Sequence, residues 1–296
     1  MSLKIGMIGT DSSHTVAFAR IINDQAHPFH VAGGKITHVV RTWSADFQLS
    51  YSREERFSSQ LFNDFGIPFA QMTDIGKYCD AFMLEAADGR KHLELFKQLV
   101  VWNKPIFIDK PLAIGVEAAN EIIQLSKLHN VPVMSSSALR YSHALNEQLS
   151  SIDKQQIRKV TVKCPLIIEP TQSRYYWYVI HGVEVLYAIL GAGCIDIAVA
   201  INEHSDVITG IWSNEMIGEI VCAHDTTQPF EVIVHTENQE VFISLSDQAH
   251  QIPYYASLLE EVMLFFTHKT SPISYDEMLE VVSFIEKAEQ QYKSIT

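Results

Sequence analysis

Two stretches of the sequence carry side chains that could do chemistry on a small molecule. The first is Asp109-Lys110-Pro111, which directly follows the apolar run at residues 106–108. A short apolar run bounded by prolines is typical of a buried strand in a parallel sheet, and ligands bind at the carboxyl ends of such strands. Lys110 is therefore a candidate for binding or catalysis, although these residues also fit a solvated Lys-Pro turn.

The second stretch places His181 and Glu184 three residues apart in an apolar segment that follows the aromatic cluster at residues 175–178. Side chains three apart on a helix share a face, so the two can meet one ligand. A neutral imidazole is a competent general base at pH 7. The alternative is a buried histidine that is hydrogen-bonded to Glu184. A metal site is disfavoured because no third ligand is spaced with them.

The start of the chain resembles the entry to a dinucleotide-binding unit. A strand pattern at residues 3–8 is followed by a turn and then by a helix at about residues 14–23. Counted from Gly9, the fingerprint Gly-x-Gly-x-x-Gly has its second and third glycines replaced by Asp11 and His14. Contact with a cofactor and plain helix capping by Asp11 are therefore about equally favoured. The candidate cofactor-binding residues here are Gly9, Thr10, Asp11, Ser12, Ser13 and His14.

The second strand, at residues 35–41, bears on the choice of cofactor. An NAD site usually places an acid at the end of this strand, but the chain has Arg41 there and Ser44 soon after. Both would suit a 2′-phosphate, which weakly favours NADP, and both also fit an ordinary turn. The spacing of His27, His30 and His38 matches no metal motif, so we expect no metal ion.

Strand and helix patterns alternate over the first 137 residues, which predicts a doubly wound parallel sheet. A capping box at Ser52–Glu55 predicts the start of the second helix, which Gly66 ends. Glu85 follows the strand at residues 81–84, again as a charge at a carboxyl end. The further expected strands are 67–69, 106–108 and 131–134, and the further expected helices are 73–78, 88–102 and 116–129.

After residue 140 the pattern changes to consecutive strands with short polar connections, which is typical of an antiparallel or mixed sheet. We therefore expect a Rossmann domain at residues 1–137 and an α+β domain at residues 138–296, with an open-faced, mostly antiparallel sheet. The expected strands are 159–168, 195–201, 206–212, 217–223, 231–235 and 240–245, and two helices at 254–267 and 274–292 close the chain.

The composition limits the classes of partner. The chain has 296 residues, of which 47% are hydrophobic and 19% charged, so it can build full-sized cores. A formal net charge of -13 disfavours binding to nucleic acid. No apolar run approaches the length of a membrane span, and the start of the chain has no signal-peptide pattern. Four widely separated cysteines fit reduced thiols, so we expect a cytoplasmic protein.

Together these residues resemble the Gfo/Idh/MocA family of NAD(P)-dependent oxidoreductases. Asp109-Lys110-Pro111 stands in the place of the family's Glu-Lys-Pro motif, and His92 fits the family's histidine in the preceding helix. The family's Asp-x-Gly-x-His-x-x-Asp motif corresponds to Trp177, Val179, His181 and Glu184. The departures are Asp11, in place of a fingerprint glycine, and Trp177, in place of the family's catalytic aspartate.

The resemblance implies a fold, a cofactor and roles for residues. It implies that Lys110 contacts both substrate and cofactor, that the Lys110-Pro111 peptide is cis, and that His181 exchanges the proton of a substrate hydroxyl. The expected cofactor is NAD or NADP. Further candidates for binding it are Arg41, Ser44, Glu85, His92 and Lys110. Candidates to line the substrate pocket are Arg140, Tyr176, Tyr178 and Glu184. Of these, Tyr176, Tyr178 or Glu184 could replace the missing aspartate.

The expected function is oxidation or reduction of a secondary alcohol on a sugar- or cyclitol-like polyol, by a homodimer or homotetramer. One alternative is a non-catalytic ligand-binding or regulatory protein on the same scaffold, which Asp11 and Trp177 favour. Another is a lyase or hydrolase that uses the nicotinamide transiently, as some members of the family do.

Overall fold

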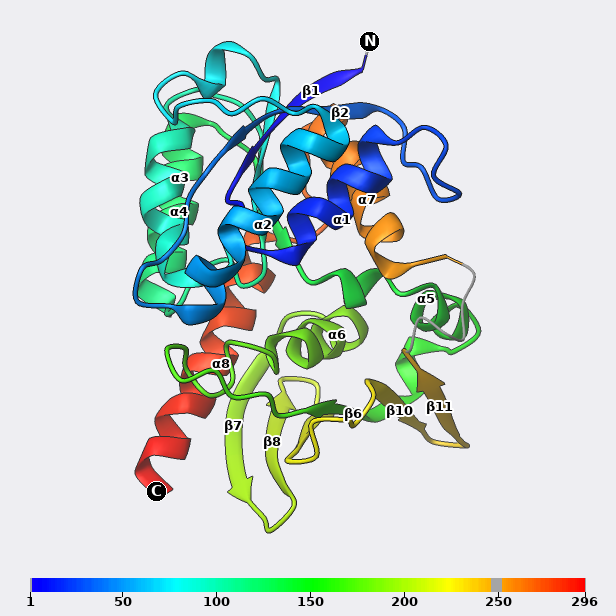
Figure 1. Ribbon diagram of the computed structural model, residues 1–296. Helices are drawn as coiled ribbons and strands as arrows, with labels where there is room; N and C mark the ends of the chain where they lie inside the picture. Colours follow the sequence, from blue (N-terminus) through cyan, green and yellow to red (C-terminus); the bar gives the residue numbers. More distant parts are fainter. Residues whose placement is uncertain (1, 246–251, 296) are drawn as a thin grey trace. The chain divides into compact units, whose positions relative to one another are not determined.

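The computed structural model describes residues 2–245 and 252–295 of the chain (Figure 1). Its contacts divide it into two compact units. Unit 1 contains the residues up to Ser136 together with Tyr255–Tyr275, and unit 2 contains Ser137–Tyr254 and the residues from Asp276 onward. Each unit has its own sheet and its own buried core.

Unit 1 is built on a five-stranded sheet in the order β2-β1-β3-β4-β5, and every pairing in it is parallel. Most side chains of β1 and all those of β3, β4 and β5 are buried, because helices cover the sheet on both faces. The predicted doubly wound sheet is confirmed. The strands are β1 (Leu3–Ile8), β2 (Gly34–Val40), β3 (Ala81–Leu84), β4 (Ile106–Asp109) and β5 (Val133–Ser136).

The strand order reverses between β1 and β3. After β2 and α2 the chain reaches Phe69, which forms a single bridge with Val39 on the far side of β2. The chain then crosses to β3, which pairs with the opposite edge of β1. The predicted strand at residues 67–69 is reduced to this bridge. Such a reversal makes the carboxyl ends of β1 and β3 the expected ligand position.

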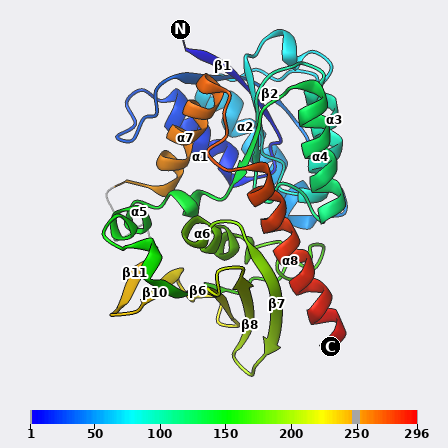
Figure 2. The same ribbon diagram turned by 180° about the vertical axis from the view of Figure 1, so that it is seen from behind.

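The helices of unit 1 pack in pairs. The helix α1 contacts α2, and α3 contacts α4, with the strands between the two pairs (Figures 1 and 2). The predicted helices are confirmed, except that residues 73–78 form only a 3₁₀ turn and residues 88–102 split into a 3₁₀ turn and α3. The helices are α1 (Ser13–Asn23), α2 (Gln48–Phe65), α3 (His92–Val100), α4 (Val116–His129) and α7 (Tyr254–His268).

The predicted capping box at Ser52 is wrong. The helix α2 begins at Gln48, and its N-cap, Phe47, makes no side-chain capping bond. The ring of Phe47 is fully buried, so core packing fixes the start of the helix instead of a polar cap. Gly66 ends the helix as predicted, in the left-handed region at φ 64°.

Unit 2 is built on a six-stranded sheet in the order β11-β10-β6-β9-β8-β7. The pair β6 and β9 is parallel, and the other pairs are antiparallel. The predicted mostly antiparallel sheet is confirmed. The strands are β6 (Ile157–Pro165), β7 (Cys194–Ile201), β8 (Ser205–Trp212), β9 (Ile217–Ala223), β10 (Glu231–Thr236) and β11 (Glu240–Ser244).

One face of this sheet is covered and the other is open. The helix α6 (Ile180–Leu190) packs on β6 and β9, and the Phe284 ring of α8 (Tyr275–Ile295) meets Trp212 of β8. A shorter helix, α5 (His143–Ser150), precedes the sheet. Large apolar side chains remain exposed on the open face, namely Ile211, Ile217 and Phe242.

In the parts that the structure describes, no helix is both long and apolar enough to cross a membrane. All four cysteines are free thiols, as expected, and three of them are buried.

A buried carboxylate fixes the loop after β3. Asp88 is 1% exposed and accepts hydrogen bonds from the Arg90 backbone N–H and guanidinium. Arg90 also pairs with Asp46, an exposed residue at the start of the segment that leads into α2. Although burial alone would raise the pKa of Asp88, the hydrogen bonds from Arg90 hold this pKa at about 2.

We expect Asp88→Asn to lower the free energy of unfolding by about 2 kcal/mol at neutral pH. The pKa is lower in the folded state, so the unfolded state takes up the proton first as the pH falls. The stabilisation is therefore complete above about pH 5 and is lost as the pH falls from about 4 to 2. Urea unfolding of both proteins at about pH 7 and pH 3 measures this difference. Asp46→Asn is the matched control and should cost less than about 1 kcal/mol. An Asp88→Asn effect that does not shrink at low pH would contradict the assignment.

Candidate functional site

The loop after β1 lies unusually close to the loop after β3. Gly9 has a φ of 107°, and a Cβ at this position would lie 2.5 Å from the backbone nitrogen of Ala86. Only glycine fits both conditions. The sequence keeps this first glycine of the fingerprint because the two strand ends at the reversal point are in direct contact.

Asp11 connects three segments of unit 1 through its carboxylate. Ser50 of α2 donates a hydrogen bond to Oδ2 at 2.5 Å, and the backbone N–H of Ala87 donates to Oδ1 at 3.0 Å. The side chain is fully buried, and this burial raises the pKa of Asp11 although both hydrogen bonds act to lower it. The carboxylate of Asp11 therefore binds the protein itself, and contact of this residue with the cofactor stays a prediction.

The amino end of α1 has the features of an anion site. Ser12 caps the helix by accepting a hydrogen bond from the His14 N–H, and no acidic residue lies in the first turn. Ser13 is exposed, whereas the Thr10 hydroxyl is buried and donates to Glu54. The positive end of the helix dipole is therefore not offset by a carboxylate of its own first turn.

Arg41 is already paired with two carboxylates. Its guanidinium donates to both oxygens of Glu54, at 2.7 and 2.6 Å, and to Glu55 at 2.8 Å. These pairs raise the pKa of Arg41. Ser44 is buried, and its backbone N–H donates to the Ser50 hydroxyl. Binding of a 2′-phosphate by Arg41 and Ser44 stays a prediction, and for Arg41 it would compete with these two carboxylates.

Three titratable side chains meet at the carboxyl ends of β3 and β4. His14 Nδ1 lies 2.8 Å from Asp109 Oδ2, and Glu85 contributes a carboxylate within 4.8 Å of both. Glu85 is fully buried, and neither of its oxygens has a hydrogen-bond partner among the described residues. Burial, together with the charge of Asp109, raises the pKa of Glu85, and the charge of Lys110 opposes this rise.

The turn that carries Lys110 is held by His92. The imidazole lies between two backbone carbonyls, with Nδ1 2.8 Å from Pro111 O and Nε2 2.9 Å from Ala86 O. The Lys110-Pro111 peptide is cis, as the resemblance implied. Since the ring is fully buried and both of its nitrogens contact backbone carbonyls, His92 positions the turn, and its contact with the cofactor stays a prediction.

In unit 2, His181 lies in the first turn of α6. Its ring is oriented by Ser137, which was not among the predicted site residues. His181 Nδ1 lies 2.7 Å from the Ser137 hydroxyl. The edge of the imidazole meets the rings of Tyr178 and Phe230, at centroid distances of 5.2 and 6.0 Å. A hydrogen bond at one nitrogen and two aromatic neighbours fix the ring plane. Ser137 directly follows β5, and its position at a strand end was the one available signal.

Three of the four residues expected to line the substrate pocket have partners within unit 2, and their contact with a substrate stays a prediction. Arg140 donates to Glu184 at 2.9 Å and to Glu277 at 2.7 Å, and these two carboxylates outweigh burial and raise the pKa of Arg140. The Tyr176 hydroxyl donates to the backbone oxygen of Val282. Arg140, Glu184 and Tyr176 are all buried or nearly so and serve the packing of unit 2. Tyr178 lies beside His181, and its contact with a substrate stays a prediction.

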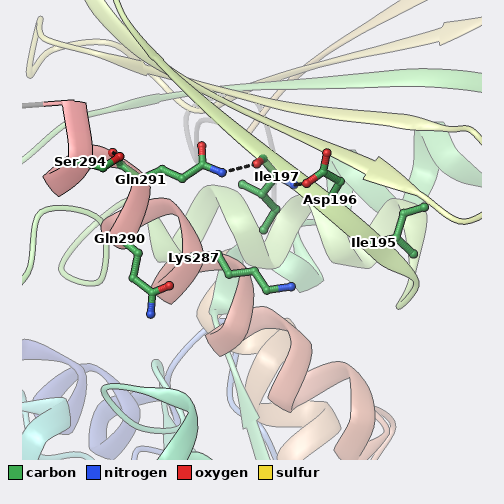
Figure 3. A pocket seen from close by; sticks show the side chains of 7 residues that line it. All are labelled: Ile195, Asp196, Ile197, Lys287, Gln290, Gln291 and Ser294. Atoms are coloured by element: carbon green, nitrogen blue, oxygen red, sulfur yellow. Dashed lines mark hydrogen bonds between the residues drawn. The ribbon is translucent and has the colours of Figure 1, made fainter.

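A cavity of about 300 Å³ lies between β7 and α8 in unit 2. Figure 3 shows the side chains that line it. Gln291 spans from α8 to β7 through a hydrogen bond to the Ile197 carbonyl oxygen. No predicted site residue lines this cavity. Its lining consists of Ile195, Asp196, Ile197, Lys287, Gln290, Gln291 and Ser294.

Comparison with known families decides the class of unit 1. Residues 3–137 match the Gfo/Idh/MocA family, described as "Oxidoreductase family, NAD-binding Rossmann fold". The N-terminal part of the chain belongs to the Gfo/Idh/MocA oxidoreductases. The match confirms the predicted family, and with it the expected enzyme class and the NAD-type cofactor. Among curated proteins, none matches the chain.

Solved structures of several dehydrogenases share the fold of the whole chain. Myo-inositol dehydrogenase from Lactobacillus casei, in complex with NAD(H) and myo-inositol, is 15% identical with a TM-score of 0.78, covering 99% of this chain and 95% of that one. Apo scyllo-inositol dehydrogenase from the same organism is 11% identical with a TM-score of 0.79, covering 99% and 96%. UDP-N-acetylglucosamine 3-dehydrogenase GnnA from Acidithiobacillus ferrooxidans is 11% identical with a TM-score of 0.74, covering 98% and 99%.

We expect Glu184→Ala to lower the free energy of unfolding by roughly 3 kcal/mol, because it leaves the buried Arg140 charge with one partner fewer. Glu237→Ala, which breaks an exposed pair with Arg158, is the control and should cost less than about 1 kcal/mol. Urea unfolding followed by circular dichroism gives both values. Equal costs for the two variants would show that the Arg140 pair is not a structural one.

Proposed function

We propose that the protein is an NAD(H)-dependent dehydrogenase or reductase that acts on a secondary alcohol of a sugar- or cyclitol-like polyol. The Lys110–Pro111 turn, held at the end of β4 by His92, is the observation that carries the proposal. The family match of residues 3–137 supports the oxidoreductase class. The names of the similar structures, which are inositol and sugar-nucleotide dehydrogenases, support the substrate class.

The residues of unit 1 fit a dinucleotide. The amino end of α1 would hold the pyrophosphate, because Asp11 is turned into the protein and the first turn of α1 has no acid. The tight turn at Gly9 would let the backbone approach the phosphates closely. When bound there, the nicotinamide supplies the hydride acceptor or donor. Thr10, Ser12, Ser13 and His14 remain the candidates of the first loop for contacts with it.

His181 would act on the hydroxyl proton of the substrate. The hydrogen bond between Nδ1 and the Ser137 hydroxyl sets the orientation of the ring, and an imidazole held in this way can accept a proton at neutral pH. Lys110 would stabilise the negative charge that develops on the substrate oxygen.

A non-catalytic ligand-binding protein is the second candidate. Trp177, in place of the catalytic aspartate of the family motif, favours it. Binding of NADH without turnover of any polyol would support this candidate against the first. Assembly as a homodimer or homotetramer, and a cytoplasmic location, stay predictions.

Replacing the proposed base should remove turnover and spare the binding of cofactor. We expect His181→Ala to lower kcat by about 100-fold to 10,000-fold, because proton transfer to a positioned side chain contributes a factor of this size. The Kd for NADH should stay within about twofold, since His181 belongs to unit 2. Initial rates on a panel of inositols and sugars, followed at the absorbance of NADH, measure the effect. His204→Ala, at an exposed histidine, is the control, and wild-type turnover in His181→Ala would exclude the residue as the base.

The cofactor preference should be for NAD over NADP. Arg41 is held by Glu54, and the exposed carboxylate of Glu55 beside it would repel a 2′-phosphate. We expect NADH to bind at least about tenfold more tightly than NADPH, which corresponds to roughly 1.4 kcal/mol. Titration with each nucleotide, followed by nicotinamide fluorescence, gives both Kd values. Glu55→Gln should narrow the difference. Tighter binding of NADPH by the unaltered protein would contradict the assignment.

A further inference from the structure

The cluster of His14, Glu85 and Asp109 has a chemistry that hydride transfer does not require. His14 lies in the first turn of α1, Glu85 directly follows β3, and Asp109 is the last residue of β4. All three belong to unit 1. One imidazole nitrogen and one oxygen from each carboxylate lie within 4.8 Å of one another. Three chain segments that are far apart in sequence thus bring three metal-ligating atoms to one point.

Glu85 is the member of the cluster whose carboxylate lacks a hydrogen-bond partner among the described residues. It is fully buried, and neither carboxylate oxygen accepts a hydrogen bond from any described residue. A buried carboxylate without hydrogen bonds is costly. The nearby Lys110 provides one positive charge against the two carboxylates of Glu85 and Asp109. A bound cation would provide the missing partner for Glu85 and balance the remaining negative charge.

The donor set selects the kind of cation. Calcium and magnesium prefer oxygen ligands alone, whereas an imidazole with carboxylates suits zinc and similar transition metals. Ligands of zinc lie about 2.0–2.2 Å from the ion in a tetrahedral arrangement, so two ligands on one ion lie roughly 3.3 Å apart. His14 Nδ1 and Asp109 Oδ2, which are 2.8 Å apart in a direct hydrogen bond, would separate by roughly 0.5 Å to bind one ion. A modest rotation of Glu85 would complete the set.

The surroundings of His14 hold its ring in place for this role. The Phe18 and Tyr255 rings contact the imidazole, at centroid distances of 5.5 and 5.1 Å. The His14 side chain is 14% exposed, so an ion can reach the site from solvent.

We propose that His14, Glu85 and Asp109 form a binding site for one divalent transition-metal ion of the zinc type. Three protein ligands leave at least one coordination position for water or another oxygen ligand.

Metal titration of the full chain tests the site without nucleotide or polyol, so its outcome is independent of the proposed dehydrogenase activity. The protein is freed of metal with a chelator and titrated with Zn²⁺ by calorimetry, then with Co²⁺ by visible absorption. We expect one equivalent to bind and the Co²⁺ spectrum to report a histidine–carboxylate site. Glu85→Gln, which keeps the shape and removes the charged ligand, should weaken the affinity by at least about tenfold.

One control variant and a second ligand variant show whether the ion binds at this cluster. Glu94→Gln, at an exposed glutamate of α3, should bind metal like the unaltered protein. His14→Asn should lose the equivalent as Glu85→Gln does, and thermal unfolding identifies a variant that fails to fold. No stoichiometric binding at about millimolar ion would overturn the proposal. Unchanged affinity in both His14→Asn and Glu85→Gln would overturn it as well, since the ion would then bind elsewhere.

Discussion

The buried carboxylate of Asp11 is the constraint on which the carboxyl edge of the first sheet depends. It joins the loop after β1 to Ser50 of α2 and to the backbone of Ala87. Gly9, two residues earlier, allows the same loop to contact the loop after β3. With both features in place, the amino end of α1 is held at the reversal point of the strand order, where an open α/β sheet binds its ligand.

Several buried acidic side chains lie at the same edge of the sheet, and most of them have hydrogen-bond partners that compensate for the cost of burial. Asp11 has a hydroxyl and a backbone N–H, Asp88 has the Arg90 guanidinium, and Asp109 has the His14 imidazole. Glu85 differs because its carboxylate has no hydrogen-bond partner among the described residues. Sites that bind ligands often keep such unsatisfied groups, and this one lies where the strand ends converge.

Much of the architecture could be predicted because it depends on local patterns. Apolar runs marked the parallel strands, and Gly66 marked the end of α2. The start of α2 could not be predicted from its polar residues, since burial of the Phe47 ring sets it. Local sequence shows which caps are available, whereas packing decides which of them is used.

The side-chain partners were the least predictable part of the site. Arg41 was expected to suit a 2′-phosphate, and Arg140 was expected to line the substrate pocket. Glu54 and Glu184, which pair with them, lie 13 and 44 residues away along the chain. Ser137 was overlooked for the same reason, since its contact with His181 also spans 44 residues. Only the folded chain shows which charges are already paired.

Hydrogen–deuterium exchange with and without saturating NADH tests the central claim most directly. If the carboxyl edge of the first sheet binds the dinucleotide despite Asp11, the amides of residues 9–14 and of the loop after β3 at residues 85–89 should exchange more slowly when NADH is bound. Unchanged exchange in both segments, or protection confined to other parts of the chain, would contradict it.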